Sequence, residues 1–263
     1  VQMIAIPTLE MAFWAGLGLC VGSFVNVLIH RLPEEQSILH PRSRCPKCAA
    51  PIAFYDNIPV LSFLLLRGRC RRCRKPISRR YPLVEASCGA LGAGLSLRWP
   101  GDPLWTALAL VAAGLLLAVA LIDWDTFLIP NSLSLGLLTA GLLIAPFNPL
   151  FEGGLGWRWL LSLGGAAAGF FGCWAIAEFG ERIFKKEAMG GGDVKLLAAV
   201  GAWSGVLGAF DCMVVGSALG AAYGVGLLVL GRIRRQAPIP FGPFLSAGAV
   251  FNFFFLLPFG FPF

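Results

Sequence analysis

A run of three glycines leads into a single carboxylate in Gly190-Gly191-Gly192-Asp193, just before a long apolar segment. Glycine lets a backbone come close to a neighbouring chain or to a substrate. A carboxylate at the edge of such a segment is costly in free energy, and groups of this kind generally have a function. We therefore predict that Asp193 is catalytic and that Gly190, Gly191 and Gly192 form a loop that closes on the substrate.

A second acidic group, Asp123-Trp124-Asp125, follows another apolar segment that ends at Ile122. Two carboxyl groups held close together share one proton, because both cannot be ionised at short range. The ionised member can activate a water molecule while the protonated member supplies a proton, which is peptide hydrolysis without a metal or a covalent intermediate. We predict that Asp123 and Asp193 form this pair.

Each of these acids also has a simpler interpretation. Asp123 and Asp125 can lie in an ordinary polar turn, followed by a helix that Asn131-Ser132 caps. Asp193 can be an acid in the first turn of a helix, where the helix dipole favours negative charge. Lys195 is expected only to extend its ammonium group towards water.

Four cysteines form two CxxC pairs, Cys45/Cys48 and Cys70/Cys73, in a polar segment. Two such turns can offer four thiolates to one tetrahedral zinc ion, with no coordination position left for a substrate. Disulfide bonds are the main alternative, and a redox-active CxxC pair is another. We favour a structural zinc ion that fixes the shape of the loop, because we place this segment in the reducing cytosol.

The composition is that of an integral membrane protein. Of the 263 residues, 57% are hydrophobic and only 13% are charged, and the mean hydropathy is +0.75. A soluble domain of this length does not need so many apolar side chains to fill a core. We predict an all-α, polytopic fold of about eight transmembrane helices with a cytosolic zinc-ribbon-like loop. The predicted spans are residues 10–29, 83–98, 104–122, 132–147, 158–180, 194–210, 213–231 and 243–258.

The lysines and arginines predict the orientation of these spans, since short loops rich in them stay in the cytoplasm. If the chain starts outside, the loop 31–82 and the later loops on its side carry all of the 21 basic residues except Arg98 and Arg158. Asp123 and Asp193 then lie at the same cytosolic boundary. The net charge of +7 reflects this orientation, and we expect no nucleic-acid partner. The loop arginines can also attract anionic lipids or an acidic partner.

In these residues the chain resembles a known family. Gly190 to Asp193 is similar to the GxGD signature of intramembrane aspartyl proteases, and Asp123 to Asn131 resembles the first aspartate motif of the type IV prepilin peptidases. In that family the aspartate that stands where Asp123 does before Pro130 is catalytic, which selects Asp123 over Asp125. Further segments that look like family signatures are residues 16–27, 30–33, 55–60, 79–85 and 239–244.

The resemblance implies a membrane aspartic endopeptidase that removes a short basic leader from prepilins or pseudopilins after a glycine. Members of the family that carry the cysteine loop also methylate the new N-terminal residue, commonly phenylalanine, with S-adenosylmethionine as the methyl donor. By resemblance, we expect the methyl donor to bind at Asn26, His30, Arg31 and Glu85. His30 and Arg31 can instead be interfacial anchors, and Glu85 can pair with an arginine of the loop.

The expected organisation has two parts. Residues 1–100, with the cysteine loop 31–82, form the methyltransferase part, and residues 101–263 form the transmembrane aspartyl peptidase. The resemblance implies a multi-pass protein of the bacterial inner membrane, with its active site at the cytosolic face and prepilins and the lipid bilayer as partners. Its oligomeric state is left open. The alternatives are a GxGD protease that cuts other membrane helices without methylation, and a non-enzymatic membrane scaffold whose zinc loop recruits a partner.

Overall fold

The computed structural model describes residues 2–185, 189–234 and 238–256, and within these ranges the fold is all-α, as predicted. The only extended pairings in these ranges are two isolated bridges, one between Arg44 and Pro51 and one between Arg69 and Pro76. The chain forms two compact units, residues 1–114 and 115–263. Their boundary falls inside helix α4 (Pro103–Thr126).

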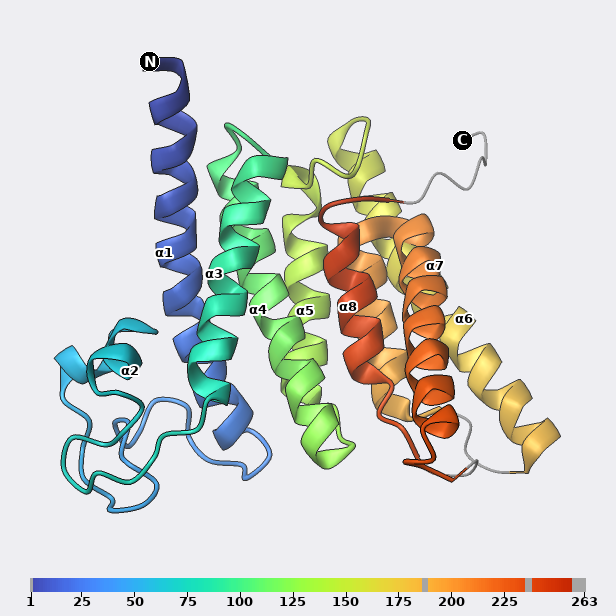
Figure 1. Cartoon of the computed structure of the whole chain (residues 1–263). Helices are drawn as coiled ribbons and strands as arrows, with labels where there is room; N and C mark the ends of the chain where they lie inside the picture. The colour runs from blue at the N-terminus through green and yellow to red at the C-terminus, as the bar shows by residue number, and fades with distance from the viewer. Residues whose placement is uncertain (1, 186–188, 235–237, 257–263) are drawn as a thin grey trace. The chain divides into compact units, whose positions relative to one another are not determined.

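The first unit is built on two antiparallel helices, α1 (Gln2–Arg31) and α3 (Arg80–Arg98), which lie side by side (Figure 1). Glycine lets the two backbones touch, because a Cβ at Gly22 would lie only 2.6 Å from the Cα of Glu85. Close packing through small residues is typical of helices in membranes. The segment between these helices contains a 3-10 turn, η1 (Phe54–Asn57), and a short helix, α2 (Leu61–Leu65).

The second unit contains the end of α4 and the later helices. These are α5 (Asn131–Ile144), the 3-10 turn η2 (Ala145–Phe147), α6 (Leu155–Phe184), α7 (Gly191–Val229) and α8 (Gly242–Asn252). α6 packs antiparallel to the first part of α7, because Gly165 faces Gly201 whereas Gly169, farther along α6, faces Leu197. The hydroxyl of Ser162 adds a hydrogen bond to the carbonyl of Ala202 at 2.7 Å.

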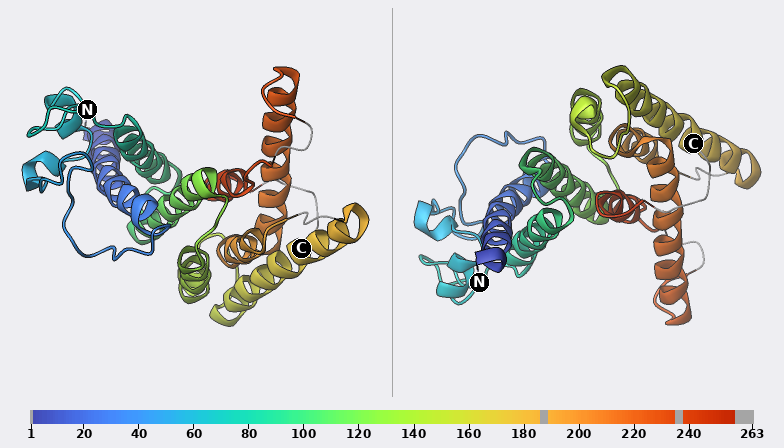
Figure 2. Two further views of the ribbon diagram at one scale, coloured as in Figure 1. Left: turned by 90° about the horizontal axis from the view of Figure 1, so that it is seen from below. Right: turned by 90° about the horizontal axis from the view of Figure 1, so that it is seen from above.

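Helix α7 turns back at Gly205, whose φ of 73° and ψ of −172° lie in a region that only glycine occupies readily. Just before the turn, Trp203 contacts Phe253, which follows the end of α8. Beyond the turn, Gly216 faces Phe244 near the start of α8, so the second limb of α7 runs antiparallel to that helix. Figure 2, which views the helices from their ends, shows the two orange limbs of α7 as separate rods.

The described residues contain eight α-helices, in agreement with the predicted number, and each predicted span falls on a helix. Two spans fall on α7, and α2 is a five-residue helix that we did not predict. We predicted the break within α7 at residues 211–212, but the turn lies at Gly205, where the backbone needs a residue without a side chain. Residues 257–258 of the last predicted span lie outside the described residues.

Four helices in the described part of the chain are long and apolar enough to cross a bilayer, namely Thr8–Arg31, Pro103–Thr126, Leu155–Ile183 and Gly191–Val229. The last has 39 residues, and a single crossing needs only ~20, which agrees with its two limbs. A shorter apolar stretch covers Asn131–Phe147. The chain is therefore a multi-pass membrane protein.

The contact between α6 and α7 predicts that a glycine-to-alanine substitution lowers stability inside the contact but not beside it. Gly201→Ala places a Cβ against the carbonyl of Gly165, and overpacking of this kind costs about 1–3 kcal/mol. Gly164→Ala meets no atom within 4 Å and should leave stability unchanged or raise it slightly, since alanine favours helix. In neutral detergent, thermal unfolding followed by circular dichroism should show a Tm lower by roughly 5 °C for Gly201→Ala only. Equal Tm values for the two variants would contradict this packing.

Candidate active site and metal centre

Both predicted catalytic carboxylates are buried in the second unit. Asp123, in the last turn of α4, is 5% exposed, and Asp193, in the first turn of α7, is 8% exposed. The start of α7 lies next to the end of α4, because Gly192 packs on Ile129, and the two carboxyl groups are within electrostatic range of each other. Asp125 is exposed, and residues two apart on a helix do not share a face. The structure thus brings Asp123 and Asp193 together and leaves Asp125 outside the pair.

A third segment, the start of α8, reaches the same carboxylate. The backbone N–H of Gly242 donates a hydrogen bond to Oδ2 of Asp123 at 2.9 Å. A Cβ at Gly242 would lie 2.8 Å from that oxygen, so only glycine fits there without displacing the carboxylate. The sequence marked residues 239–244 as a family signature without a role, and the structure makes Gly242 a positioning residue for Asp123.

The three glycines before Asp193 differ in their surroundings. Gly192 packs on Ile129, where an added Cβ would lie 3.0 Å from the isoleucine Cβ. Among the described residues, Gly191 has no atom within 4 Å of such a position, and at Gly190 the nearest side-chain atom would be Oδ2 of Asp193 at 3.5 Å. Gly192 therefore serves packing, while Gly190 and Gly191 leave an open strip of backbone beside the carboxylate.

Lys195 joins the start of α7 to the start of α5. Its Nζ donates a hydrogen bond to Oδ1 of Asn131 at 2.8 Å. Pro130 occupies the N-cap position of α5, and no side chain caps that helix. The interpretation of Asn131-Ser132 as a cap is therefore wrong, and Lys195 does more than extend into water, because it ties two helix ends together next to Asp193.

The carboxylates lie at the basic end of the second unit. α6 is antiparallel to the first limb of α7, so Arg182 in the last turn of α6 lies towards the end where α7 begins with Lys195. Arg232 follows the second limb, which ends beside the start of α8. Arg158 lies at the opposite end of α6 and donates to the carbonyl of Pro146 at 2.8 Å. Lys186 and Arg235 lie outside the described residues.

The four cysteines of the first unit form one cluster. The Sγ atoms of Cys45, Cys48, Cys70 and Cys73 all lie within 4.8 Å of one another, and those of Cys45 and Cys73 are 3.9 Å apart. A tetrahedron with metal–sulfur bonds of about 2.3 Å has sulfur atoms about 3.8 Å apart. All four cysteines are free thiols. This arrangement fits a tetrahedral metal ion.

The two CxxC turns repeat one backbone pattern. In the first, the N–H of Cys45 donates to the carbonyl of Ala50, and in the second, that of Cys70 donates to the carbonyl of Lys75, both at 2.9 Å. Sequence reasoning did not recognise this repeat, although the pattern R-C-x-x-C-x-x-P-I was there to find. It occurs at residues 44–52 and 69–77.

Cys70 is prepared for metal binding by its own turn. The backbone N–H groups of Cys73 and Arg72 donate to its sulfur and lower the pKa of the thiol from 9.0 to about 6. Because the thiolate is the form that binds a metal, Cys70 is available as a ligand at neutral pH.

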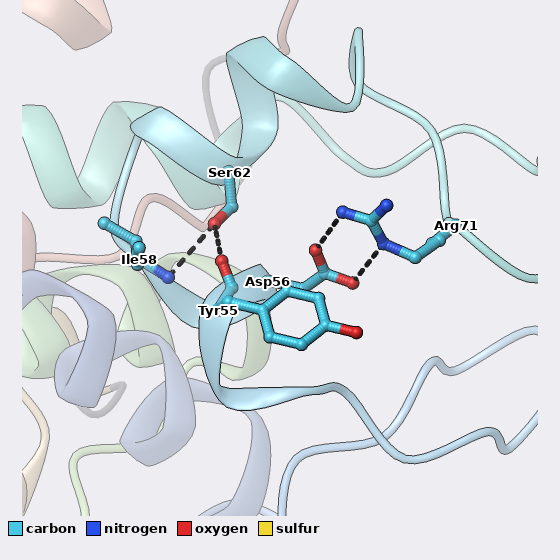
Figure 3. Close-up of polar contacts among 5 residues, drawn as sticks. All are labelled: Tyr55, Asp56, Ile58, Ser62 and Arg71. Carbon is cyan, nitrogen blue, oxygen red and sulfur yellow. Dashed lines mark hydrogen bonds and ion pairs between the residues drawn. The ribbon is translucent and has the colours of Figure 1, made fainter.

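A bidentate ion pair joins η1 to the second CxxC turn (Figure 3). Arg71 donates from Nε and Nη2 to the two carboxylate oxygens of Asp56 at 2.8 and 2.6 Å, and it holds the pKa of that carboxyl below its usual value. The guanidinium also lies 5.5 Å from the centre of the Tyr55 ring. Ser62 attaches α2 to the same segment, since its hydroxyl accepts from the N–H of Ile58 at 3.1 Å and donates to the carbonyl of Tyr55 at 3.0 Å.

Three of the four predicted methyl-donor residues lie where α1 meets α3. The amide of Asn26 donates to the carbonyl of Tyr81 at 3.1 Å, and Nε2 of His30 lies 2.6 Å from the Tyr81 hydroxyl. Oε2 of Glu85 accepts a hydrogen bond from the N–H of Val60 at 2.7 Å, a backbone partner and not an arginine. Val60 has a φ of 60°, which is unusual for a β-branched residue. The hydrogen bond to Glu85 therefore stabilises a strained backbone conformation in the loop.

Arg31, the fourth of these residues, is engaged with the loop that follows α1. Its guanidinium donates to the carbonyl of Ser37 at 2.8 Å and to that of Pro41 at 2.5 Å. These bonds make Arg31 an anchor for the start of the cysteine loop.

Two family models match the chain. Residues 17–99 match the model of the bacterial peptidase A24 N-terminal domain, and residues 90–225 match that of the type IV leader peptidase family. The chain therefore belongs to the type IV leader peptidase family.

Several similar relatives carry the name prepilin leader peptidase/N-methyltransferase. The protein of Burkholderia pseudomallei is 40% identical, over 97% of this chain and 89% of the relative. That of Aeromonas hydrophila is 39% identical over 92% and 89%, and that of Klebsiella pneumoniae is 47% identical over 76% and 87%. No solved structure matches the chain.

The cysteine cluster predicts a metal content that one substitution removes. Cys70→Ser deletes the thiol with the lowered pKa, so a protein that carries about one zinc ion per chain should fall to near zero. Cys20→Ser changes an exposed cysteine outside the cluster and should keep its zinc. Elemental analysis of the purified full chain measures both variants, and unchanged zinc in Cys70→Ser would exclude the four-thiolate site.

Proposed function

We propose that this protein removes the leader peptide of type IV prepilins by acid–base catalysis at Asp123 and Asp193, and that it then methylates the new N-terminal residue. The observation that supports the proposal most directly is the pair of buried carboxylates, contributed by two distant segments and held within electrostatic range of each other. The membership of the chain in the leader peptidase family gives this pair its substrate class.

The cleavage step needs one ionised and one protonated carboxyl group. The ionised group takes a proton from a water molecule, and the oxygen of that water attacks the carbonyl carbon of the scissile bond. The protonated group donates to the carbonyl oxygen and, as the C–N bond breaks, a proton passes to the leaving amine. The N–H of Gly242 is hydrogen-bonded to Oδ2 of Asp123, so Oδ1 is the oxygen of that carboxyl that we assign to the water or the substrate.

Substrate backbone has an open strip to lie on. Gly190 and Gly191 have no side chains and few close neighbours, so an extended segment can approach Asp193. An aromatic row lies by the other carboxylate, because Trp124 contacts Tyr223 at 5.5 Å and Tyr223 contacts Phe244 at 5.6 Å between ring centres. We propose that this row receives the apolar part of the prepilin while its basic leader stays in the cytosol.

The methyl-donor site is proposed at the α1–α3 interface. S-adenosylmethionine, when bound, supplies a methyl group from a positively charged sulfonium. Glu85 suits this charge, because its carboxylate is a negative group at this interface, held there by the N–H of Val60 and the side chain of Ser23. His30 orients the Tyr81 ring beside it, while Asn26 and Arg31 fix the helix end and the loop around the site.

The proposed location is the bacterial inner membrane, with both activities at the cytosolic face. The basic end of the second unit carries the carboxylates, which agrees with the rule that basic loops stay inside. Residues 1–100, including a zinc-bound loop 31–82, are assigned to methylation and residues 101–263 to cleavage. Prepilins or pseudopilins and the lipid bilayer are the partners of this arrangement, and nucleic acid is not one.

Removal of either carboxylate should stop cleavage. Asp123→Asn and Asp193→Asn each keep the size of the side chain but lose the proton exchange, so kcat should fall by about 10³-fold or more. The assay incubates full-length protein with a prepilin and S-adenosylmethionine and follows the mass of the product. Normal leader removal by either variant would overturn the proposed mechanism.

Two controls belong to this experiment. Asp125→Asn alters an exposed neighbour and should cleave at a rate within a few-fold of the unchanged protein. Methylation of a synthetic peptide that already lacks the leader should continue in Asp123→Asn and Asp193→Asn, which shows that the first unit of these variants is folded.

Gly242→Ala tests the positioning of Asp123. The added methyl group would lie 2.8 Å from Oδ2 and must push the carboxylate away from its N–H partner. We expect kcat to fall by about 10–100-fold with a smaller change in KM, because the loss is in the chemical step. Gly172→Ala, where no atom lies within 4 Å, is the matched control and should keep its activity. If the Gly242→Ala protein kept its full kcat, Gly242 would have no role in positioning Asp123.

A further inference from the structure

We propose that the second CxxC turn binds the phosphate group of an anionic phospholipid. A pocket of about 280 Å³ lies between the end of α2 and this turn. Four arginines and two leucines line it, namely Leu65, Leu66, Arg67, Arg69, Arg71 and Arg74. This proposal concerns a site apart from the carboxylate pair and does not depend on catalysis.

The charge in the pocket is compensated only in part. Asp56 accepts hydrogen bonds from Nε and Nη2 of Arg71. The third nitrogen of that guanidinium, Nη1, points away from the carboxylate (Figure 3). Among the described residues, no ion pair involves Arg67, Arg69 or Arg74. Arginines crowded around one pocket repel one another, and a phosphate that accepts their hydrogen bonds would offset this repulsion.

Comparison of the two turns shows that the charges of Arg71 and Arg74 are not needed for such a turn to form, whereas Arg67 and Arg69 match Arg42 and Arg44. The residue after the second cysteine has the same left-handed backbone in both, with a φ of 55° at Ala49 and of 58° at Arg74. The first turn therefore forms with alanine where the second has arginine. In the same way Pro46 stands in the first turn where Arg71 stands in the second. The basic side chains of Arg71 and Arg74 are thus an addition to a turn that can form without them.

The position of α2 argues for a lipid and against a free anion. The N–H of Val60, directly before α2, is bound to Glu85, which lies about 7 Å along α3 from its first residue, Arg80. The start of α2 is thus held beside the first turns of α3, which packs against α1, a helix long and apolar enough to cross a bilayer. Three leucines of α2 remain exposed there, Leu61 at 49%, Leu64 at 64% and Leu65 at 72%.

Arginines beside exposed leucines are complementary to the two parts of a phospholipid at the surface of a bilayer. The leucines can lie against acyl chains while the guanidinium groups, on flexible stems, reach the phosphate. Each basic residue near the surface raises the affinity for anionic headgroups by roughly 5-fold. A zwitterionic lipid lacks the net charge and should bind less well.

The test measures lipid binding to the full chain in neutral detergent by native mass spectrometry. The probes are phosphatidylglycerol and phosphatidylcholine with identical acyl chains, supplied at equal concentration. The unchanged protein should retain phosphatidylglycerol in preference to phosphatidylcholine. In Arg67→Gln/Arg74→Ala this preference should fall by about 10-fold or more. Arg42→Gln/Lys47→Ala removes the same charge from the first turn and should keep the preference within about 2-fold of the unchanged protein, if the pocket and not the overall charge binds the lipid.

Other outcomes would overturn the proposal. An equal loss in both double variants would mean that total loop charge, and not the pocket, attracts lipid. Binding of inorganic phosphate without any preference for phosphatidylglycerol would identify a free-anion site. Both double variants should retain their zinc, which verifies that the turns are folded, and Arg74→Ala alone, matched by Ala49 in the first turn, repeats the measurement with a single change.

Discussion

Two carboxylates can be buried among apolar helices only if the surrounding backbone gives them partners, because an unpaired charge in such surroundings is very costly. The second unit meets this requirement by bringing three helix ends to one place. Asp123 ends α4, Asp193 begins α7, and the first N–H of α8, at Gly242, donates to the carboxylate of Asp123. A helix start carries free N–H groups and a favourable dipole for an acid.

Glycine makes that convergence possible, and it acts in two ways. At Gly242 and Gly201 the absence of a side chain allows another group to come close, a carboxylate in one case and the backbone of α6 in the other. At Gly205 the backbone itself takes a conformation that other residues avoid, which turns α7 back so that its second limb runs along α8. The second limb lies beside the start of α8, whose first residue donates to Asp123.

The cysteine loop shows how one small scaffold can carry two tasks. Its two CxxC turns share their hydrogen bonds, and together they place four sulfur atoms at the separation that a tetrahedral metal requires. The metal-binding part needs only the cysteines and the turn backbone. The positions between and after the cysteines are thereby free to vary, and in the second turn they are basic. The bond between Val60 and Glu85 then attaches this loop to α3 within the first unit.

The sequence by itself determined the class of fold, the family and the cysteine cluster, and it predicted the carboxylate pair. These rest on composition, on apolar segments of sufficient length and on short motifs, all of which are local properties of the chain. Only the tertiary structure decided that Gly242 holds Asp123, that Asn131 binds Lys195 instead of capping α5, and that α7 turns at Gly205. Each of these depends on which distant segment lies opposite a residue, and hydropathy and spacing along the chain contain no record of that neighbour.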